Sequence, residues 1–177
     1  MRFAAPVKSR PVRSEQIILF RVSEQLFAVS SASVQEVRSV DSLSGAATEI
    51  TVPGLKKVRH IVHRNEQSLY VVNGAMHFGL PLTPGSLVFV LRGTRTALLV
   101  DGIDKMTTMT RLQALPQSFC SQERLWYRGL TALDQSIVPV VNPEGFLSQD
   151  ELFLLDASLV SSQSSGSANL GSVEPAQ

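Results

Sequence analysis

Short runs of apolar and β-branched residues recur along the chain, separated by polar breaks or by breaks that contain glycine or proline. At the start, Ile18, Phe20 and Val22 alternate with other residues before a polar Ser23-Glu24-Gln25 turn. This period of two predicts a half-buried β-hairpin. Similar turns are expected at residues 65–67 and 134–136. The apolar runs cover residues 17–22, 26–29, 58–62, 69–72, 87–91, 97–100 and 137–141.

Many short strands joined by turns favour an all-β sandwich or barrel. A doubly wound parallel sheet would need helices of a dozen residues between its strands, and the sequence shows no such pattern. Residues 39–50 are expected to form a mobile connecting loop. The sequence therefore places most of the chain in the all-β class.

Two segments have helical features. Residues 111–119 are predicted to be a short helix or a turn, broken at a proline. Residues 148–159 begin with Ser148 and Glu151 at the spacing of a capping box. We expect a C-terminal helix that packs on the β-structure through leucines at helical intervals. These are Leu152, Leu155 and Leu159.

The domain organisation follows from composition. Residues 1–14 are basic and are predicted to be a flexible tail, and residues 15–159 form one domain that includes the helix. Residues 160–177 are rich in serine and glycine with few apolar side chains. They are predicted to be disordered because they cannot bury enough surface to offset the entropy of ordering.

Composition narrows the class of function. Sixteen basic and fifteen acidic side chains give a net charge of +1, so no global field favours nucleic acid or an anionic membrane. No stretch approaches the roughly 18 apolar residues of a membrane-spanning helix, and the start lacks the apolar core of a secretory signal. A lone Cys120 fits a reducing compartment. We expect a cytoplasmic protein without direct membrane insertion.

Candidate catalytic and metal-binding residues are sparse. His60 and His63 are three apart, so on a strand they would project to opposite faces and would not share an ion. We find no nucleophile elbow and no phosphate-binding glycine loop. We expect no enzyme, no metal and no cofactor. A small β-barrel enzyme that assembles distant residues such as His63, Asp101 and Cys120 is the alternative from another class.

The order of several motifs resembles one known family. V-Q-E-V-R at residues 34–38 follows the opening hairpin, A-L-L-V-D-G-I occupies residues 97–103, and Y-R-G-L and I-V-P-V-V-N-P-E-G-F-L follow at 127–130 and 137–147. Together these motifs resemble the CheW-like chemotaxis coupling proteins. The resemblance implies two intertwined five-stranded SH3-like β-barrels with a groove between them and a short C-terminal helix.

The same resemblance implies a non-enzymatic signalling adaptor. Its expected partners are the signalling tip of a methyl-accepting chemoreceptor and the regulatory domain of a CheA-like histidine kinase. It would act in the cytoplasm, recruited to membrane-associated receptor arrays, without a cofactor and without nucleic acid. The alternative within the family is a specialised adaptor of a motility, pilus or developmental pathway that binds one of the usual partners.

One hairpin departs from the family pattern. Family members carry G-x-x-N-x-R-G-x-x-x-P-x-x-D-L there, and Arg64 lies one position from the expected arginine. A one-residue offset on a strand reverses the face to which a side chain points. The change reflects either drift at a structural turn or an altered interface. All seven corresponding positions differ, namely His60, His63, Asn65, Glu66, Tyr70, Asn73 and Gly74.

Glu36 and Arg38 are the leading functional candidates because they would share one strand face as a charged pair able to orient a docked helix. An exposed polar strand edge with core valines is the simpler interpretation. Val37 and Val100 are expected to line the groove between the barrels. The full set of candidate partner-binding residues is Val34, Glu36, Val37, Arg38, Arg64, Asn65, Val100 and Asp101.

Overall fold

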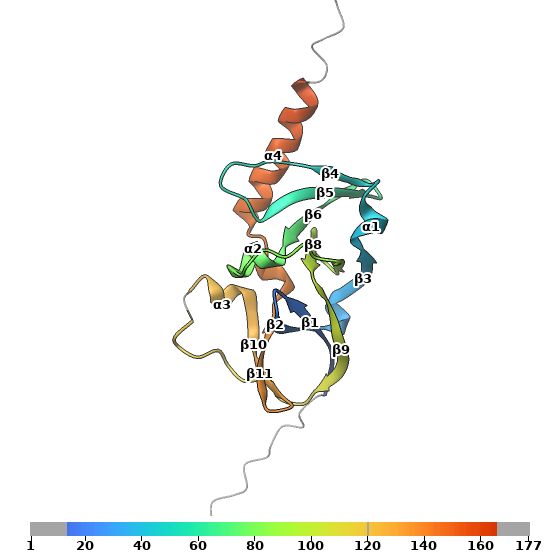
Figure 1. Cartoon of the computed structure of the whole chain (residues 1–177). Helices are drawn as coiled ribbons and strands as arrows, with labels where there is room; N and C mark the ends of the chain where they lie inside the picture. The colour runs from blue at the N-terminus through green and yellow to red at the C-terminus, as the bar shows by residue number, and fades with distance from the viewer. Residues whose placement is uncertain (1–13, 120, 166–177) are drawn as a thin grey trace, which may run out of the picture.

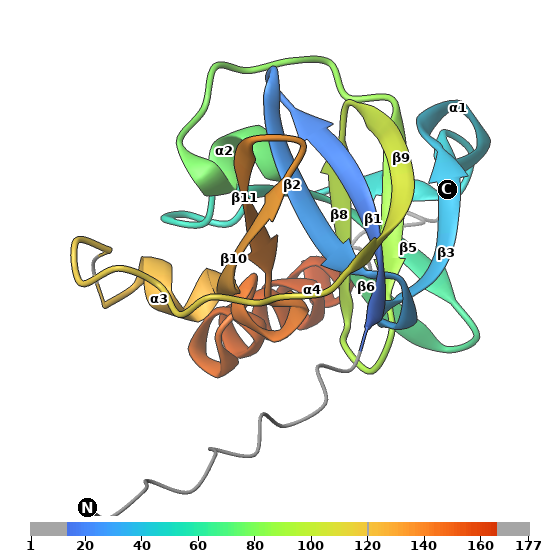
Figure 2. The ribbon, with the colours of Figure 1, turned by 90° about the horizontal axis from the view of Figure 1, so that it is seen from below.

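The computed structural model describes residues 14–119 and 121–165, with side chains up to residue 162. Two β-sheets, here called sheet A and sheet B, make up most of it (Figure 1). Sheet A has the strand order β10-β11-β2-β1-β9, and Figure 2 shows these strands from below. Their bounds are β1 (Glu15–Val22), β2 (Gln25–Ser30), β9 (Gly102–Met109), β10 (Tyr127–Leu133) and β11 (Ser136–Val141).

Sheet B has the strand order β3-β7-β8-β6-β5-β4. Each sheet contains one parallel pair, β11 with β2 and β6 with β8, and its other pairs are antiparallel. The predicted all-β class with two β-units is confirmed, and β4 gives sheet B a sixth strand. Its strands are β3 (Val34–Ser39), β4 (Ala47–Glu49), β5 (Val58–Arg64), β6 (Gln67–Asn73), β7 (Leu87–Leu91) and β8 (Thr96–Val100).

Strand β1 is buried on both faces, which corrects the expectation of a half-buried hairpin. Ile18 and Phe20 face the main core between the two sheets, whereas Ile17 and Leu19 face a second core within sheet A. All four side chains are at most 5% exposed. The reason is topological, because β1 lies inside sheet A and sheet B covers its other face.

The hairpin turns lie at the predicted positions, but each is one residue shorter than expected. Three hairpins turn through two residues with positive φ, namely Ser23-Glu24, Asn65-Glu66 and Asp134-Gln135. Two-residue turns of this kind match the right-handed twist of the flanking strands. The third predicted residue of each turn is already the first residue of the next strand.

The C-terminal helix α4 (Gln149–Ser165) is confirmed and runs past its predicted end. The Ser148 amide donates to the Glu151 carboxylate at 2.8 Å, and the Glu151 amide donates to the Ser148 hydroxyl at 3.1 Å. This reciprocal pair is the predicted capping box. Leu155 is fully buried in the main core, and Leu152 and Leu159 pack against it. Residues 160–165, which were predicted to belong to a disordered tail, are instead part of this helix. The predicted tails at 1–13 and 166–177 lie outside the described residues.

Two segments differ from the sequence-based expectation. Residues 39–50 contain α1 (Val40–Leu43) and β4, because the Ser39 hydroxyl accepts a hydrogen bond from the Ser42 amide and Leu43 is buried. Of the two predictions for residues 111–119, the turn is found and the helix is not, since Gln113 pairs with Leu130 of β10 and a turn follows Pro116. The remaining short elements are η1 (Ser31–Ser33), α2 (Gly74–Phe78), α3 (Glu123–Trp126) and η2 (Pro143–Gly145).

Candidate functional site

Six of the eight candidate partner-binding residues lie on β3 or at the β5–β6 turn. Within this group Glu36 accepts hydrogen bonds from Arg38 Nε at 2.5 Å and from Arg64 Nη1 at 2.6 Å. We call these three residues the Glu36 cluster. Strand β3 is one edge of sheet B, and β5 lies next to the other edge. The sheet is therefore curved enough for a side chain at the end of β5 to reach the edge strand β3.

The Glu36 cluster is a surface feature. The hydrogen bond from Arg38, helped by the positive charges of Arg38 and Arg64, holds the pKa of Glu36 below its usual value. The three side chains are between 29% and 38% exposed. Ion pairs with this exposure contribute about 0 to 1 kcal/mol to folding. The cluster therefore adds little to the stability of the fold.

Strand β3 presents different chemistry on its two faces. Glu36 pairs with Val90 and Arg38 with Val88, whereas Val37 pairs with Phe89 of the main core. Paired residues in a sheet share a face. Val37 is therefore on the face opposite the charges, and it remains 39% exposed. Val34, at the start of the strand, is 9% exposed and belongs to the main core.

Arg64 reaches Glu36 despite its one-residue offset from the family pattern. The following residue, Asn65, has a φ of 46°, which asparagine tolerates better than most residues. Both side chains line a groove of about 840 Å³ that runs between the turns of sheet B and α4. The Glu36 cluster is thus located at the side of a groove.

Val100 and Asp101 lie apart from this group, which corrects the expectation that Val100 lines a groove. Val100 is fully buried in the main core, so a partner cannot touch it. Asp101 accepts a hydrogen bond from the Ser23 amide at 2.6 Å and another from the Thr83 hydroxyl at 2.6 Å. Asp101 therefore attaches the β1–β2 turn to the loop before β7, which is a structural task.

Several residues of the divergent hairpin also have structural tasks. The Asn73 side chain accepts a hydrogen bond from the Met76 amide at 3.0 Å and caps α2. At Gly74 a Cβ atom would lie 2.7 Å from the Leu99 carbonyl oxygen, so a larger side chain would not fit. His60 and His63 are exposed on β5. Of the residues that depart from the family pattern, Asn73 and Gly74 thus have structural roles, whereas His60 and His63 change the surface of the hairpin.

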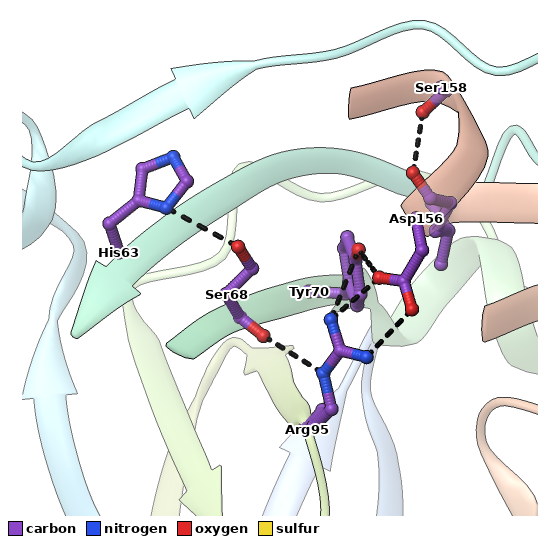
Figure 3. Close-up of polar contacts among 7 residues, drawn as sticks. His63, Ser68, Tyr70, Arg95, Asp156 and Ser158 are labelled. Carbon is purple, nitrogen blue, oxygen red and sulfur yellow. Dashed lines mark hydrogen bonds and ion pairs between the residues drawn. The ribbon is translucent and has the colours of Figure 1, made fainter. Parts of the chain in front are cut away.

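Tyr70 belongs to a second charged cluster that the sequence did not reveal (Figure 3). Arg95 donates to both carboxylate oxygens of Asp156, at 2.8 and 2.6 Å, and to the Tyr70 hydroxyl at 3.3 Å. The Tyr70 hydroxyl in turn donates to Asp156. We call these residues the Asp156 cluster. Sequence separations of 61 and 86 residues between the partners explain why no local signal predicts it.

Burial, followed by the hydrogen bond with Asp156, raises the pKa of Tyr70 to about 12. The hydrogen bond from Arg95 lowers the pKa of Asp156. The cluster attaches α4 to sheet B. Lys57 makes a second contact with α4, because its ammonium group lies 2.8 Å from the Glu151 carboxylate. The same ammonium group donates a hydrogen bond to the Phe146 carbonyl at 2.9 Å. Arg95 and Asp156 line the same groove as Arg64.

The alternative sites find little support in the described ranges. No group of three or more His, Cys, Asp or Glu side chains within 14–119 and 121–165 is arranged to hold a metal ion. His63 contacts Ser68, whereas Asp101 bonds Ser23 and Thr83, and Cys120 lies outside the described residues. No helix of the described part is long and apolar enough to cross a membrane.

Comparison with known proteins agrees with this architecture. The chain is 26% identical over 153 residues to a probable chemotaxis protein CheW of Rhizobium etli, covering 82% of this chain and 95% of that protein. The crystal structure of the scaffolding protein TtCheW from Thermoanaerobacter tengcongensis matches with a TM-score of 0.65 at 14% identity, over 85% of this chain and 96% of that one. The model of the CheW-like domain matches residues 16–151. The chain therefore belongs to the CheW-like domain family.

Proposed function

We propose that this chain is a non-enzymatic adaptor that couples a helical chemoreceptor signalling tip to the regulatory domain of a CheA-like histidine kinase. Membership of the CheW-like family and the names of the two matching proteins support the proposal. The observation that carries it is the Glu36 cluster at the side of the groove. A protein with this role needs surfaces for two partners and no catalytic centre.

The groove fits the chemistry of a docked helix. Its volume of about 840 Å³ is lined by apolar side chains such as Leu152 and Phe153 together with polar ones such as Asn65. Amphipathic helices bind to grooves of this kind through apolar residues on one face. A guanidinium carries five N–H donors, of which Glu36 uses few, so Arg38 and Arg64 can also bind a carboxylate of the partner. The partner helix would then be apolar with acidic residues beside its apolar face.

The proposal places the protein in the cytoplasm at receptor arrays, and it requires no cofactor. The alternative is a specialised adaptor that binds one of the two partners. The exposed His60 and His63 favour this alternative, because they change the surface of the hairpin where the family carries a different pattern. The two proposals predict different complexes.

Light scattering of mixtures distinguishes them. The purified chain is mixed with a receptor signalling fragment, with the kinase regulatory domain, and with both. We expect a complex with each partner and a larger complex that contains all three chains. Binding to one partner alone would establish the specialised adaptor. Binding to neither at tens of micromolar would contradict both proposals.

A further inference from the structure

The groove between sheet B and α4 has walls of opposite charge. The charged residues that line it from the turns of sheet B are Arg64 and Arg95, whereas those that line it from η2 and α4 are Glu144 and Asp156. Polyanions such as nucleic acid bind to surfaces that are positive throughout. The groove therefore suits an occupant that carries charges of both signs.

The two walls are joined at one place. Arg95 donates hydrogen bonds to both carboxylate oxygens of Asp156, so these two charges neutralise each other within the molecule. The Asp156 carboxylate also accepts a hydrogen bond from the Tyr70 hydroxyl. The charges that remain for an occupant are those of Arg64 on one wall and Glu144 on the other.

Arg64 keeps most of its hydrogen-bonding capacity. Its side chain is 36% exposed and donates to Glu36 through Nη1 at 2.6 Å, and it makes no other hydrogen bond within the described part of the chain. A guanidinium has five N–H donors. The Glu36 cluster contains two guanidinium groups and one carboxylate, so this wall of the groove has a net positive charge.

Glu144 is an exposed carboxylate on a fixed element. Its side chain makes no hydrogen bond or ion pair with any residue that the structure describes. The 3-10 turn η2 is held in place because the Gly145 amide donates to the Asn142 carbonyl at 3.0 Å. A Cβ atom at Gly145 would clash with the Leu125 carbonyl oxygen, so η2 packs closely against α3. Glu144 is therefore preorganised to bind a cationic group.

Apolar side chains lie between these charges. Leu91 and Leu147 are buried and line the groove, and Phe153, which is 73% exposed, lines it from α4. An amphipathic helix has an apolar stripe with polar residues on either side of it. A helix with an acidic flank, an apolar stripe and a basic flank is thus the complement of the positive wall, the apolar lining and the negative wall.

We propose that the groove binds a helix that carries both signs of charge, with its acidic flank at Arg64 and its basic flank at Glu144. The inference rests on the proposed function for its occupant, the helix of a receptor signalling tip, and it adds Glu144 to the partner-binding residues. Complementary charges across an interface determine specificity and register more than affinity. A helix with one sign of charge on both flanks would be repelled at one wall.

Three labelled helical peptides test the charge pattern. Each has about 18 residues, long enough to form a helix in water, and the same leucine stripe. One has glutamates on one flank and lysines on the other, the second has glutamates on both flanks, and the third has lysines on both. Fluorescence anisotropy is measured in about 0.15 M salt, where charges more than about 8 Å apart are largely screened. We expect the wild type to bind the two-signed peptide about threefold more tightly than either of the others. Equal affinity for all three, or tightest binding of a one-signed peptide, would overturn the proposal.

Glu144→Lys gives the sharpest variant. It should bind the all-glutamate peptide more tightly than the two-signed one, which reverses the preference of the wild type, and a misfolded chain could not gain affinity in this way. The matched control is Asp150→Lys, which makes the same change of charge at an exposed residue of α4 that does not line the groove. The control should keep the wild-type preference. An unchanged preference in Glu144→Lys, or the same reversal in the control, would overturn the proposal.

Titration of the receptor signalling fragment separates this inference from the proposed function. Glu144→Lys should bind the fragment about threefold more weakly than the wild type does. If both bind it equally, the role of Glu144 is wrong and the proposed function stands. If the wild type binds the peptides in the expected order and does not bind the fragment, the proposed receptor coupling is wrong and the groove accepts a helix of another protein.

Discussion

The Glu36 cluster and the Asp156 cluster use the same chemistry for different tasks. Each has a carboxylate that accepts hydrogen bonds from arginine, and the exposure of their ion-paired side chains is similar, at 29–38% and 38–45%. They differ in what they hold together. The Asp156 cluster includes the fully buried Tyr70 and attaches α4 to sheet B, whereas the Glu36 cluster connects two partly exposed strand positions. The buried Tyr70 ring, and not the ion pair, therefore indicates that the fold depends more on the Asp156 cluster than on the Glu36 cluster.

The largest expected effect separates the clusters by stability. Tyr70→Ala removes a fully buried aromatic ring from the main core and should lower the free energy of unfolding by about 3 to 5 kcal/mol. Tyr70→Phe keeps the ring and removes the hydroxyl, so it should cost about 1 kcal/mol. Urea denaturation followed by circular dichroism measures both. A loss below about 1 kcal/mol for Tyr70→Ala would show that the Asp156 cluster is no more structural than the Glu36 cluster.

A second prediction concerns the stability of the fold in mild acid. Neither cluster should be the first group to lose its contribution to stability as the pH falls. The pKa values of Glu36 and Asp156 are both lowered, so their contribution to stability is present above the usual carboxylate pKa and is lost at a lower pH. His77 behaves differently. It is 5% exposed, its Nε2 has no hydrogen-bond partner among the described residues, and burial lowers its pKa to about 3.

The folded-state pKa of His77 lies below its usual value of 6.5, so its contribution is complete above pH 6.5 and falls as the pH drops toward 3. Between pH 6.5 and 4.5 this amounts to about 2 to 3 kcal/mol. Thermal melts of His77→Phe should lose this pH dependence, and those of Glu36→Gln should keep it. If Glu36→Gln removes the slope and His77→Phe keeps it, the Glu36 cluster carries stability after all.

The sequence predicted elements that depend on local patterns. Strand β1, the two-residue turns and the capping box of Ser148 with Glu151 follow from alternation, turn chemistry and helix-cap spacing. It failed where distant contacts decide. Residues 39–50 are ordered because Leu43 packs into a core formed by residues far along the chain. Val100 was expected to line a groove, but it is buried in the main core between the two sheets.

The candidate site shows the same division. The pairing of Glu36 with Arg38 follows from their positions two residues apart on one strand. Its third member, Arg64, is 28 residues away from Glu36, and only the curvature of sheet B brings the two together. The Asp156 cluster has no local member pair at all, so no pattern in the sequence could have indicated it.

The most direct test of the account is calorimetric titration of the receptor signalling fragment and the kinase regulatory domain against Glu36→Lys. Asp104→Lys is the matched control, because Asp104 is an exposed carboxylate paired with Arg21 on sheet A, outside the Glu36 cluster. We expect Glu36→Lys to lower the affinity for at least one partner by about tenfold or more, with a change in unfolding free energy of about 1 kcal/mol or less. The control should bind as the wild type does. Wild-type affinity of Glu36→Lys for both partners, or loss of its cooperative melt, would contradict the assignment of the Glu36 cluster to partner binding.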